Sequence, residues 1–187
     1  MKQMPKRAVT IQSSLRNLNH LPHAMKVNHV SNEELGDRLH YDESMISKIR
    51  TGKAQLQFDR IQEMFEALPT DSQFLALEVA NKMVGVTVPV LDGDRVIKEP
   101  LAITVKTMPQ LSQALNAIQN SLDEMTIPDD QLTSEDFKDP EESVRQLLDA
   151  VFYSTNLIAM ICRMFHFSMQ GELTERSKRW KEKKELK

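Results

Sequence analysis

Three histidines, His20, His23 and His29, lie within ten residues of one another, which raises the question of a metal site. A zinc site needs about four nitrogen, sulfur or oxygen ligands that converge on the ion. No carboxylate or cysteine completes such a set at helical spacing, and the histidine spacing matches no standard zinc pattern. We therefore expect solvated or capping histidines and no metal site.

The single cysteine, Cys162, lies on the apolar side of a helical pattern, beside Ile158 and Phe165. A reactive thiol needs a positive neighbour or a metal, and Arg163 falls on a different side of that helix. One cysteine also excludes an internal disulfide framework. Phosphate loops, dinucleotide-binding motifs, nucleophile elbows and zinc-protease motifs are absent as well. We therefore expect no enzyme, no catalytic residue and no cofactor.

Charge is the remaining chemical signal, and it is unevenly distributed along the 187 residues, whose net charge is −3. Residues 1–60 contain ten basic and six acidic residues, a net charge of +4. Residues 61–170 contain seven basic and seventeen acidic residues, a net charge of −10, and residues 171–187 carry +3. This segregation suggests that the first third meets an anion while the acidic middle has another task.

The run SNEELGDRLHYDESMISKIRTGK, residues 31–53, contains two short helical patterns separated by His40-Tyr41. Ser31 is a suitable N-cap for the first helix and forms a capping box with Glu34. Asp42 is a suitable N-cap for the second helix, and Gly52 is suited to end it.

The two helices must pack closely, and Gly36 lacks the side chain that would hinder their crossing. Two helices joined by a turn of three to four residues and sharing a small apolar core constitute a helix-turn-helix. The expected core residues are Leu35, Leu39, Ile46 and Ile49.

Residues 31–56 resemble, without gaps, the helix-turn-helix of the lambda-repressor-like Xre/Cro/cI family of transcriptional regulators. MISKIRTGKAQL at 45–56 is the most specific part of the match. The resemblance implies a helical domain of this type over residues 20–85. His40 stands where the family has a turn glycine, so it must tolerate a left-handed backbone.

The resemblance also implies a DNA-binding surface on double-stranded DNA. Asn32 falls on the position that holds the DNA backbone, and the second helix would enter the major groove. Acidic Asp42 and Glu43 at the tip of that helix are a departure that costs non-specific affinity. The residues that would face bases are Glu43, Ser44, Ser47 and Lys48. The phosphate candidates are Arg50 and Lys53, together with Lys2, Lys6 and Arg7 of the N-terminal arm.

The next segments are helical and then irregular. Residues 57–67 have apolar positions at helical spacing, and a Thr70–Gln73 capping box should open a helix that Gly85 ends. Around Asp92-Gly93, residues 86–97 suggest either a short β-hairpin or an irregular connector.

Beyond that connector we expect two helices, at 108–125 and 140–166, that pair in a helical hairpin or in a dimer. Residues 126–140 are polar and acidic and read as a linker, after which Asp139-Pro140 should open the second helix. The run AVFYSTNLIAMICRMF is too polar for a membrane-spanning helix, and the N-terminus has no secretory signal, so we expect a cytoplasmic protein. The apolar stripe of the first helix is Leu111, Leu115, Ile118, Leu122 and Met125.

The sequence therefore predicts an all-α protein in four parts. These are a basic arm (1–19), a helix-turn-helix domain (20–85), a connector (86–107) and a helical module for dimerisation or partner binding (108–187). We expect a sequence-specific transcriptional regulator, a repressor encoded by a phage or mobile element, that acts as a homodimer on DNA. The alternative is a protein-interaction module, such as an antitoxin, a phage-encoded inhibitor or an adaptor, whose helix-turn-helix is ancillary or autoregulatory.

Overall fold

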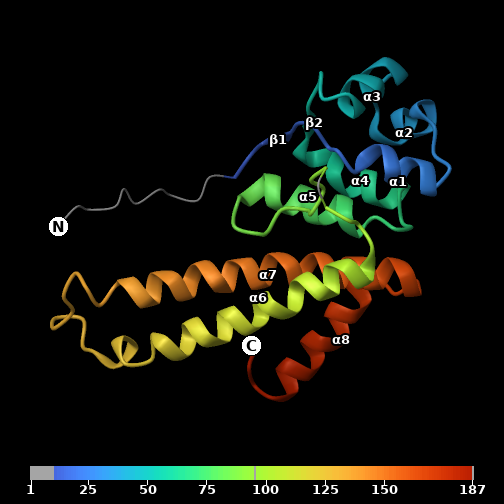
Figure 1. Cartoon of the computed structure of the whole chain (residues 1–187). Helices are drawn as coiled ribbons and strands as arrows, with labels where there is room; N and C mark the ends of the chain where they lie inside the picture. Colours follow the sequence, from blue (N-terminus) through green and yellow to red (C-terminus); the bar gives the residue numbers. More distant parts are fainter. Residues whose placement is uncertain (1–10, 95, 187) are drawn as a thin grey trace. The chain divides into compact units, whose positions relative to one another are not determined.

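The computed structural model describes residues 11–94 and 96–186, which are mostly helical, with one small two-stranded sheet (Figure 1). The predicted all-α class is therefore confirmed. The chain divides into two compact units, residues 1–89 and 90–187. They are called the N-terminal unit and the C-terminal unit below, and each is described by itself.

The N-terminal unit is a cluster of short helices joined by tight turns. Its two strands pair antiparallel, with Ser14 opposite Gln57 and Leu15 opposite Leu56. Each strand has only two residues, which is too short to produce an alternating pattern in the sequence. The elements over residues 11–89 are β1 (Ser14–Leu15), α1 (Leu21–Val27), α2 (Asn32–Leu39), α3 (Glu43–Arg50), β2 (Leu56–Gln57), the 3₁₀ helix η1 (Phe58–Arg60), α4 (Ile61–Ala67) and α5 (Gln73–Val84).

A single apolar core holds the helices and strands of the N-terminal unit together. The predicted shared residues of α2 and α3 are all buried in it. They pack in one cluster with Leu15 and Leu56 of the strand pair and with Met64 of α4. Burying such side chains contributes about 1.5–3 kcal/mol each, so this unit has a substantial hydrophobic core of its own.

The predicted start of α5 is wrong, although its predicted end is confirmed. The helix begins at Gln73 after Ser72, and no side-chain hydrogen bond caps it. Gln73 Nε2 instead donates to Asp71 Oδ1 at 2.7 Å, so the Thr70–Gln73 capping box does not form the cap. Gly85 ends the helix with a φ of 65°, in the left-handed region that glycine adopts without strain.

The C-terminal unit is built on two long helices. Ser121, which follows the first, lies beside Ser143 near the start of the second, so the helices run antiparallel as a hairpin (Figure 1). Its elements, over the described residues, are α6 (Pro100–Asn120), the 3₁₀ helix η2 (Glu124–Thr126), α7 (Lys138–Phe165) and α8 (Met169–Glu182).

Small and polar residues, rather than the expected leucines, form the buried seam between α6 and α7. Ser143 Oγ lies 2.8 Å from Ser121 Oγ and donates to the carbonyl oxygen of Ala117 at 2.7 Å. Small side chains allow two helix backbones to approach closely, so the larger residues are left outside the seam. The buried small residues of the two helices include Ala114, Ala117, Ser121, Ser143, Ala150 and Ala159.

The predicted stripe of α6 is therefore not the seam, which corrects the sequence-based interpretation. Leu111, Leu115, Leu122 and Met125 are all more than half exposed. The period of the apolar pattern predicted a helix with an apolar side correctly. The same pattern could not predict that a neighbouring row of small residues would pack against α7 instead.

The segment before α6 is irregular, and α6 itself begins earlier than expected. No residue of 86–94 or 96–97 is in a strand, so the predicted β-hairpin is wrong and the irregular-connector alternative is correct. Leu91 N donates to the buried Asn156 Oδ1 at 2.8 Å, which attaches the connector to α7. The helix α6 starts at Pro100, and Pro109 lies inside it rather than at its start.

The helix α7 also starts slightly earlier than the sequence suggests, because Phe137 rather than Asp139 is its N-cap residue. By length and composition alone, α7 is apolar enough to span a membrane, contrary to the expectation from its central run. The core helix of a soluble protein passes the same test, so this is weak evidence. Buried Asn156 and Ser143 of α7 are hydrogen-bonded within the C-terminal unit, as helix packing requires.

Candidate functional site

The first helix of the candidate site, α2, begins with a complete capping box. Glu34 N donates to Ser31 Oγ at 3.1 Å, and Ser31 N donates to Glu34 Oε2 at 2.7 Å. Both predicted partners are therefore confirmed. These bonds from the backbone and then the side chain of Ser31 lower the pKa of Glu34. The ionised carboxylate also suits the positive end of the helix dipole.

A left-handed residue turns the chain from α2 into α3. His40 has φ 57° and ψ 40°, the backbone conformation expected where the resembled family has glycine. Tyr41 N donates to the carbonyl oxygen of Gly36 at 2.9 Å, which closes the end of α2. A Cβ atom on Gly36 would lie only 2.6 Å from the carbonyl oxygen of Tyr41. Glycine is therefore required there, as the sequence predicts, but the close neighbour is the backbone of the turn rather than the crossing helix.

The second helix, α3, is capped by Asp42, also as predicted. Asp42 Oδ1 accepts from Met45 N at 2.8 Å and from Ser44 Oγ at 2.6 Å. The bond from the Ser44 hydroxyl, followed by the bond from Met45 N, lowers the pKa of Asp42. The Ser44 side chain therefore holds the cap of α3 as well as lying on its exposed side.

The two sides of α3 have different characters. Ile46 and Ile49 are buried against the core of the N-terminal unit. Their burial fixes the rotation of the helix about its axis, so the residues between them must face outward. The four residues that the resemblance assigns to base contacts are all exposed and share this outward side: Glu43, Ser44, Ser47 and Lys48.

The end of α3 is held by backbone hydrogen bonds and by Gly52. Lys53 N and Ala54 N donate to the carbonyl oxygen of Lys48 at 2.8 and 3.1 Å. Gly52 has φ 71°, and a Cβ there would overlap the side chain of Asn17. This turn leaves Lys53 exposed beyond the end of α3. It also places the segment before α1 against the base of α3.

The structure joins two of the predicted site residues that the sequence treats separately. Arg50 Nη1 in the last turn of α3 donates to Asn32 Oδ1 at the start of α2, at 2.6 Å. Asn32 is half-buried and Arg50 is exposed. The guanidinium is thereby held beside the start of α2.

The remaining phosphate candidates, Lys2, Lys6 and Arg7, lie outside the described residues. The seven site residues in the described part come from α2, α3 and the turn after α3. They are carried by two helices that pack directly on each other. The arrangement presents two hydroxyls, two lysines and an arginine on one side of a helix pair, together with the carboxylate of Glu43.

A buried carboxylate that the sequence analysis did not identify, that of Glu78, holds the segment that packs against the end of α3. Glu78 of α5 accepts hydrogen bonds from Asn19 N at 2.8 Å and from His20 N at 2.9 Å. Its second set of partners is His20 Nδ1 at 3.1 Å and Lys82 Nζ at 2.8 Å. Lys82 Nζ also donates to the backbone carbonyl oxygens of Arg16 and Asn17. The cluster therefore holds the segment that packs against Gly52.

Burial alone would raise the pKa of Glu78, but its hydrogen bonds outweigh burial and lower that pKa to about 2. The bonds come from the side chains of His20 and Lys82 and from the backbone of His20 and Asn19. Two of these partners, His20 and Asn19, lie 58 and 59 residues before Glu78 along the chain, so no local pattern predicts them, whereas Lys82 lies four residues after Glu78. His23 is similarly engaged, with Nε2 3.0 Å from Asp71 Oδ2. Among residues 11–94 and 96–186 no group of metal-binding side chains converges.

The thiol of Cys162 is buried in the C-terminal unit, as its place on the apolar side predicts. Burial, and then the charge of Glu172, raise the pKa of Cys162, which disfavours the reactive thiolate.

Comparison of the chain with protein-family models, with curated proteins and with solved structures finds no match.

Proposed function

We propose that this chain is a sequence-specific regulator of transcription that binds double-stranded DNA through α3, in the manner of the Xre/Cro/cI regulators that residues 31–56 resemble. The observation that supports this most is the outward side of α3, where exposed Ser47 and Lys48 follow a capped first turn. A helix of this kind fits the major groove, where lysine can reach guanine acceptors and serine can reach base edges.

The surroundings of α3 support the same proposal. Arg50 and Lys53 lie at its C-terminal end and are placed to contact phosphates, which position the protein without specifying sequence. The Arg50–Asn32 bond keeps the guanidinium next to the start of α2. In this proposal, two copies bind as a dimer, because one such head contacts too few base pairs for useful specificity. Occupancy of the operator would repress transcription, with no catalytic step.

The experiment is selection of bound duplexes from a random DNA pool with the full chain, followed by affinity measurements at several salt concentrations. We expect one enriched motif, with an affinity that falls steeply as salt is added. Lys48→Ala should reduce the slope of log affinity against log salt by about 1, or relax specificity at one base pair. Lys26→Ala, at an exposed lysine of α1, is the matched control. A folded chain that enriches no motif, or binds independently of salt, would disprove the proposal.

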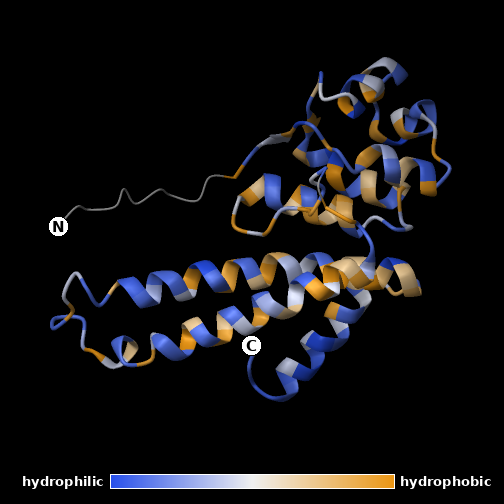
Figure 2. Ribbon diagram, in the orientation of Figure 1, coloured by the Kyte–Doolittle hydropathy of each residue, from blue (hydrophilic) through white to orange (hydrophobic). Residues whose placement is uncertain are grey.

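A second candidate is a protein-interaction module with an ancillary DNA-binding role, and one observation favours it. The two long helices α6 and α7 expose many large apolar side chains. Figure 2 shows hydrophobic positions recurring along both ribbons. Such surfaces mark interaction sites. Duplex selection separates the two candidates, because an ancillary role predicts weak or absent enrichment by the chain on its own.

A further inference from the structure

The two units differ sharply in how well they bury their large apolar residues. Among the described residues, 24 large hydrophobic side chains are exposed, and 21 of them lie in the C-terminal unit. The N-terminal unit contributes only Ile11, Phe58 and Val86 to that set. The N-terminal unit therefore completes its core within one chain, whereas the C-terminal unit does not.

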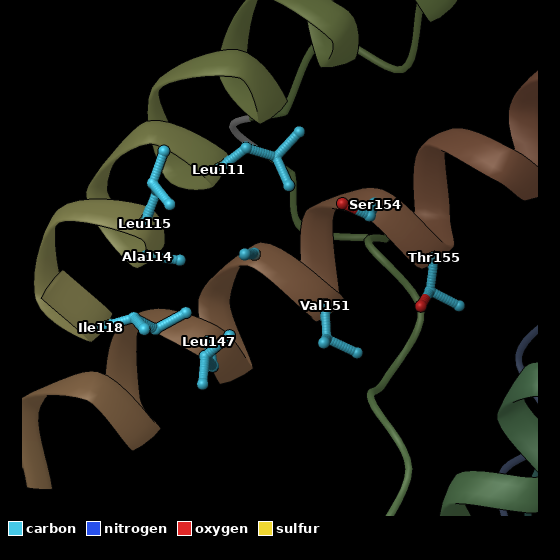
Figure 3. A pocket seen from close by; sticks show the side chains of 9 residues that line it. Leu111, Ala114, Leu115, Ile118, Leu147, Val151, Ser154 and Thr155 are labelled. Carbon is cyan, nitrogen blue, oxygen red and sulfur yellow. The ribbon is translucent and has the colours of Figure 1, made fainter. Parts of the chain in front are cut away.

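Exposed apolar residues of α6 and α7 line a groove between the two helices, and this side of the hairpin is here called the hairpin face. On α6 they recur every three or four residues, which keeps them on one side of the helix. Leu147 and Val151 of α7 lie opposite them across the open groove, which Figure 3 shows from close by. The groove is lined from α6 by Leu111, Ala114, Leu115 and Ile118, and from α7 by Leu147, Ala150, Val151, Ser154 and Thr155.

The hairpin face also lacks charge. No Asp, Glu, Lys or Arg occurs in residues 107–122 of the α6 segment or in residues 150–162 of α7. The surface of a soluble monomer is typically about 25–35% charged. Removing these two stretches from water would therefore strand no ionised group of their own, and such groups are the main cost of burying a polar surface.

We infer that the hairpin face binds a second copy of this chain, with the two hairpins antiparallel, so that α6 and α7 of each copy together form a four-helix bundle. This inference rests on the proposed function, which calls for a dimer, and identifies the surface and orientation of that dimer. Symmetric pairing through one patch requires a self-complementary surface. The apolar groove and the exposed leucines on its α6 side, Leu111 and Leu115, meet that requirement.

The size of the face suits a dimer. From Leu101 to the end of α6 at Asn120 it runs about 30 Å, at ~1.5 Å per residue. Two adjacent helices of ~10 Å diameter make it about 20 Å wide, a footprint of roughly 600 Å² before side-chain relief is added. Stable interfaces bury ~800 Å² on each partner, which is the same order.

Charge decides the orientation. The far end of the hairpin, residues 123–149, contains ten acidic and two basic residues, a net charge of −8. The opposite end leads into α8, where residues 176–186 contain six basic and two acidic residues, a net charge of +4. Parallel hairpins would place the two acidic ends together. Antiparallel hairpins keep the two acidic ends apart, each at the end where the α8 helix of the other copy begins, which is favourable.

The first test is sedimentation velocity of the full chain, where we expect a dimer of the 21.5 kDa chain. Leu115→Glu should raise the dimer dissociation constant by about 100-fold or more, because each interface would then bury unpaired carboxylates. Leu115 is 56% exposed, so the substitution need not disturb the fold. Leu173→Glu on α8, at a residue 51% exposed, is the matched control and should leave the dimer intact.

The second test measures orientation with spin labels at Asp130→Cys in a Cys162→Ala background. The α7 helix of 28 residues is about 42 Å long, so antiparallel hairpins separate the two labels by about that distance or more. Parallel hairpins would bring them within about half of it.

Three results would overturn the inference. These are a monomeric full chain, a Leu115→Glu variant that dimerises like the control, or labels close together. Flotation of the monomer with phosphatidylcholine–phosphatidylglycerol vesicles would instead assign the face to lipid. None of these measurements contains DNA. A dimer that selects no duplex therefore refutes only the proposed function, and a monomer that selects one refutes this inference but leaves sequence-specific DNA binding standing.

Discussion

Arg50 and Asn32 join the end of α3 to the start of α2 through a single hydrogen bond, Arg50 Nη1 to Asn32 Oδ1, at 2.6 Å. The bond spans 18 residues of sequence and crosses the outer edge of the helix pair. It ties the two residues assigned to the DNA backbone into one unit. The positions of these two groups on a phosphate would therefore be interdependent.

The first prediction follows from that bond. Arg50→Ala should lower the free energy of unfolding by only about 0.5–1 kcal/mol, because an exposed hydrogen bond contributes little to stability. Affinity for a selected duplex should fall about tenfold or more, because a phosphate contact and the positioning of Asn32 are lost together. A double-mutant cycle with Asn32→Ala checks this. Strictly additive effects on affinity would show that the two residues act independently.

The second prediction concerns the close approach at Gly36. Gly36→Ala should destabilise the N-terminal unit by about 1–3 kcal/mol, because the new Cβ meets the backbone oxygen of Tyr41 at 2.6 Å. This loss opposes the gain of ~1 kcal/mol that alanine normally gives within a helix. Urea denaturation measures the difference, with Asp37→Ala at the exposed neighbouring residue as the control. Stabilisation by Gly36→Ala would mean that the turn relaxes easily.

The third prediction uses the left-handed turn. His40→Gly should stabilise the chain by about 0.5–1 kcal/mol, because glycine removes the cost of a positive φ but adds freedom to the unfolded chain. His40→Ala keeps the backbone cost and should give no gain. Thermal unfolding of both variants measures this difference. Equal stabilities for the glycine and alanine variants would contradict the strain at φ 57°.

The fourth prediction is a pH dependence of stability. The pKa of Glu78 is lowered to about 2 in the folded chain, from 4.5 for the unperturbed carboxyl. Its stabilisation is therefore fully present above pH 4.5 and is lost as pH falls from there towards about 2. The loss amounts to roughly 3 kcal/mol over that window.

Urea denaturation at a series of pH values between 6 and 3 checks this prediction. Glu78→Gln should be less stable at neutral pH, because the half-buried Lys82 and His20 side chains lose their anionic partner. Its stability should also change less between pH 4.5 and 3 than that of the unsubstituted chain. An unchanged pH profile in Glu78→Gln would show that other carboxylates cause the acid sensitivity.

Local features of the helix pair could be predicted from the sequence because each depends on residues a few positions apart. The capping box of Ser31 and Glu34, the cap at Asp42 and the close approach at Gly36 are of this kind. The buried isoleucines of α3 follow equally from a helical period. Whether the outward residues contact DNA stays a prediction.

Features that depend on distant contacts could not be predicted in the same way. The Glu78–His20 cluster and the Arg50–Asn32 bond each join separate segments, and neither leaves a local pattern. The hairpin shows a second limit. The stripe of Leu111 and Leu115 identified an apolar side of α6, but a period cannot say which neighbour will cover that side. The row that contains Ala114 and Ala117 packs against α7 instead.

The hydroxyl pair of Ser121 and Ser143 fixes the register of the hairpin. If α7 slid past α6 by one helical turn, about 5.4 Å, the Ser143 hydroxyl would lose both of its partners, Ser121 Oγ and the carbonyl oxygen of Ala117, while Ser121 would keep only its bond to the carbonyl oxygen of Ile118. An unsatisfied buried hydroxyl costs about 1–3 kcal/mol, so a slipped hairpin is rare at equilibrium. Alanine at both positions would satisfy packing in several alignments. These two serines therefore select one alignment of the helices rather than add much to its strength.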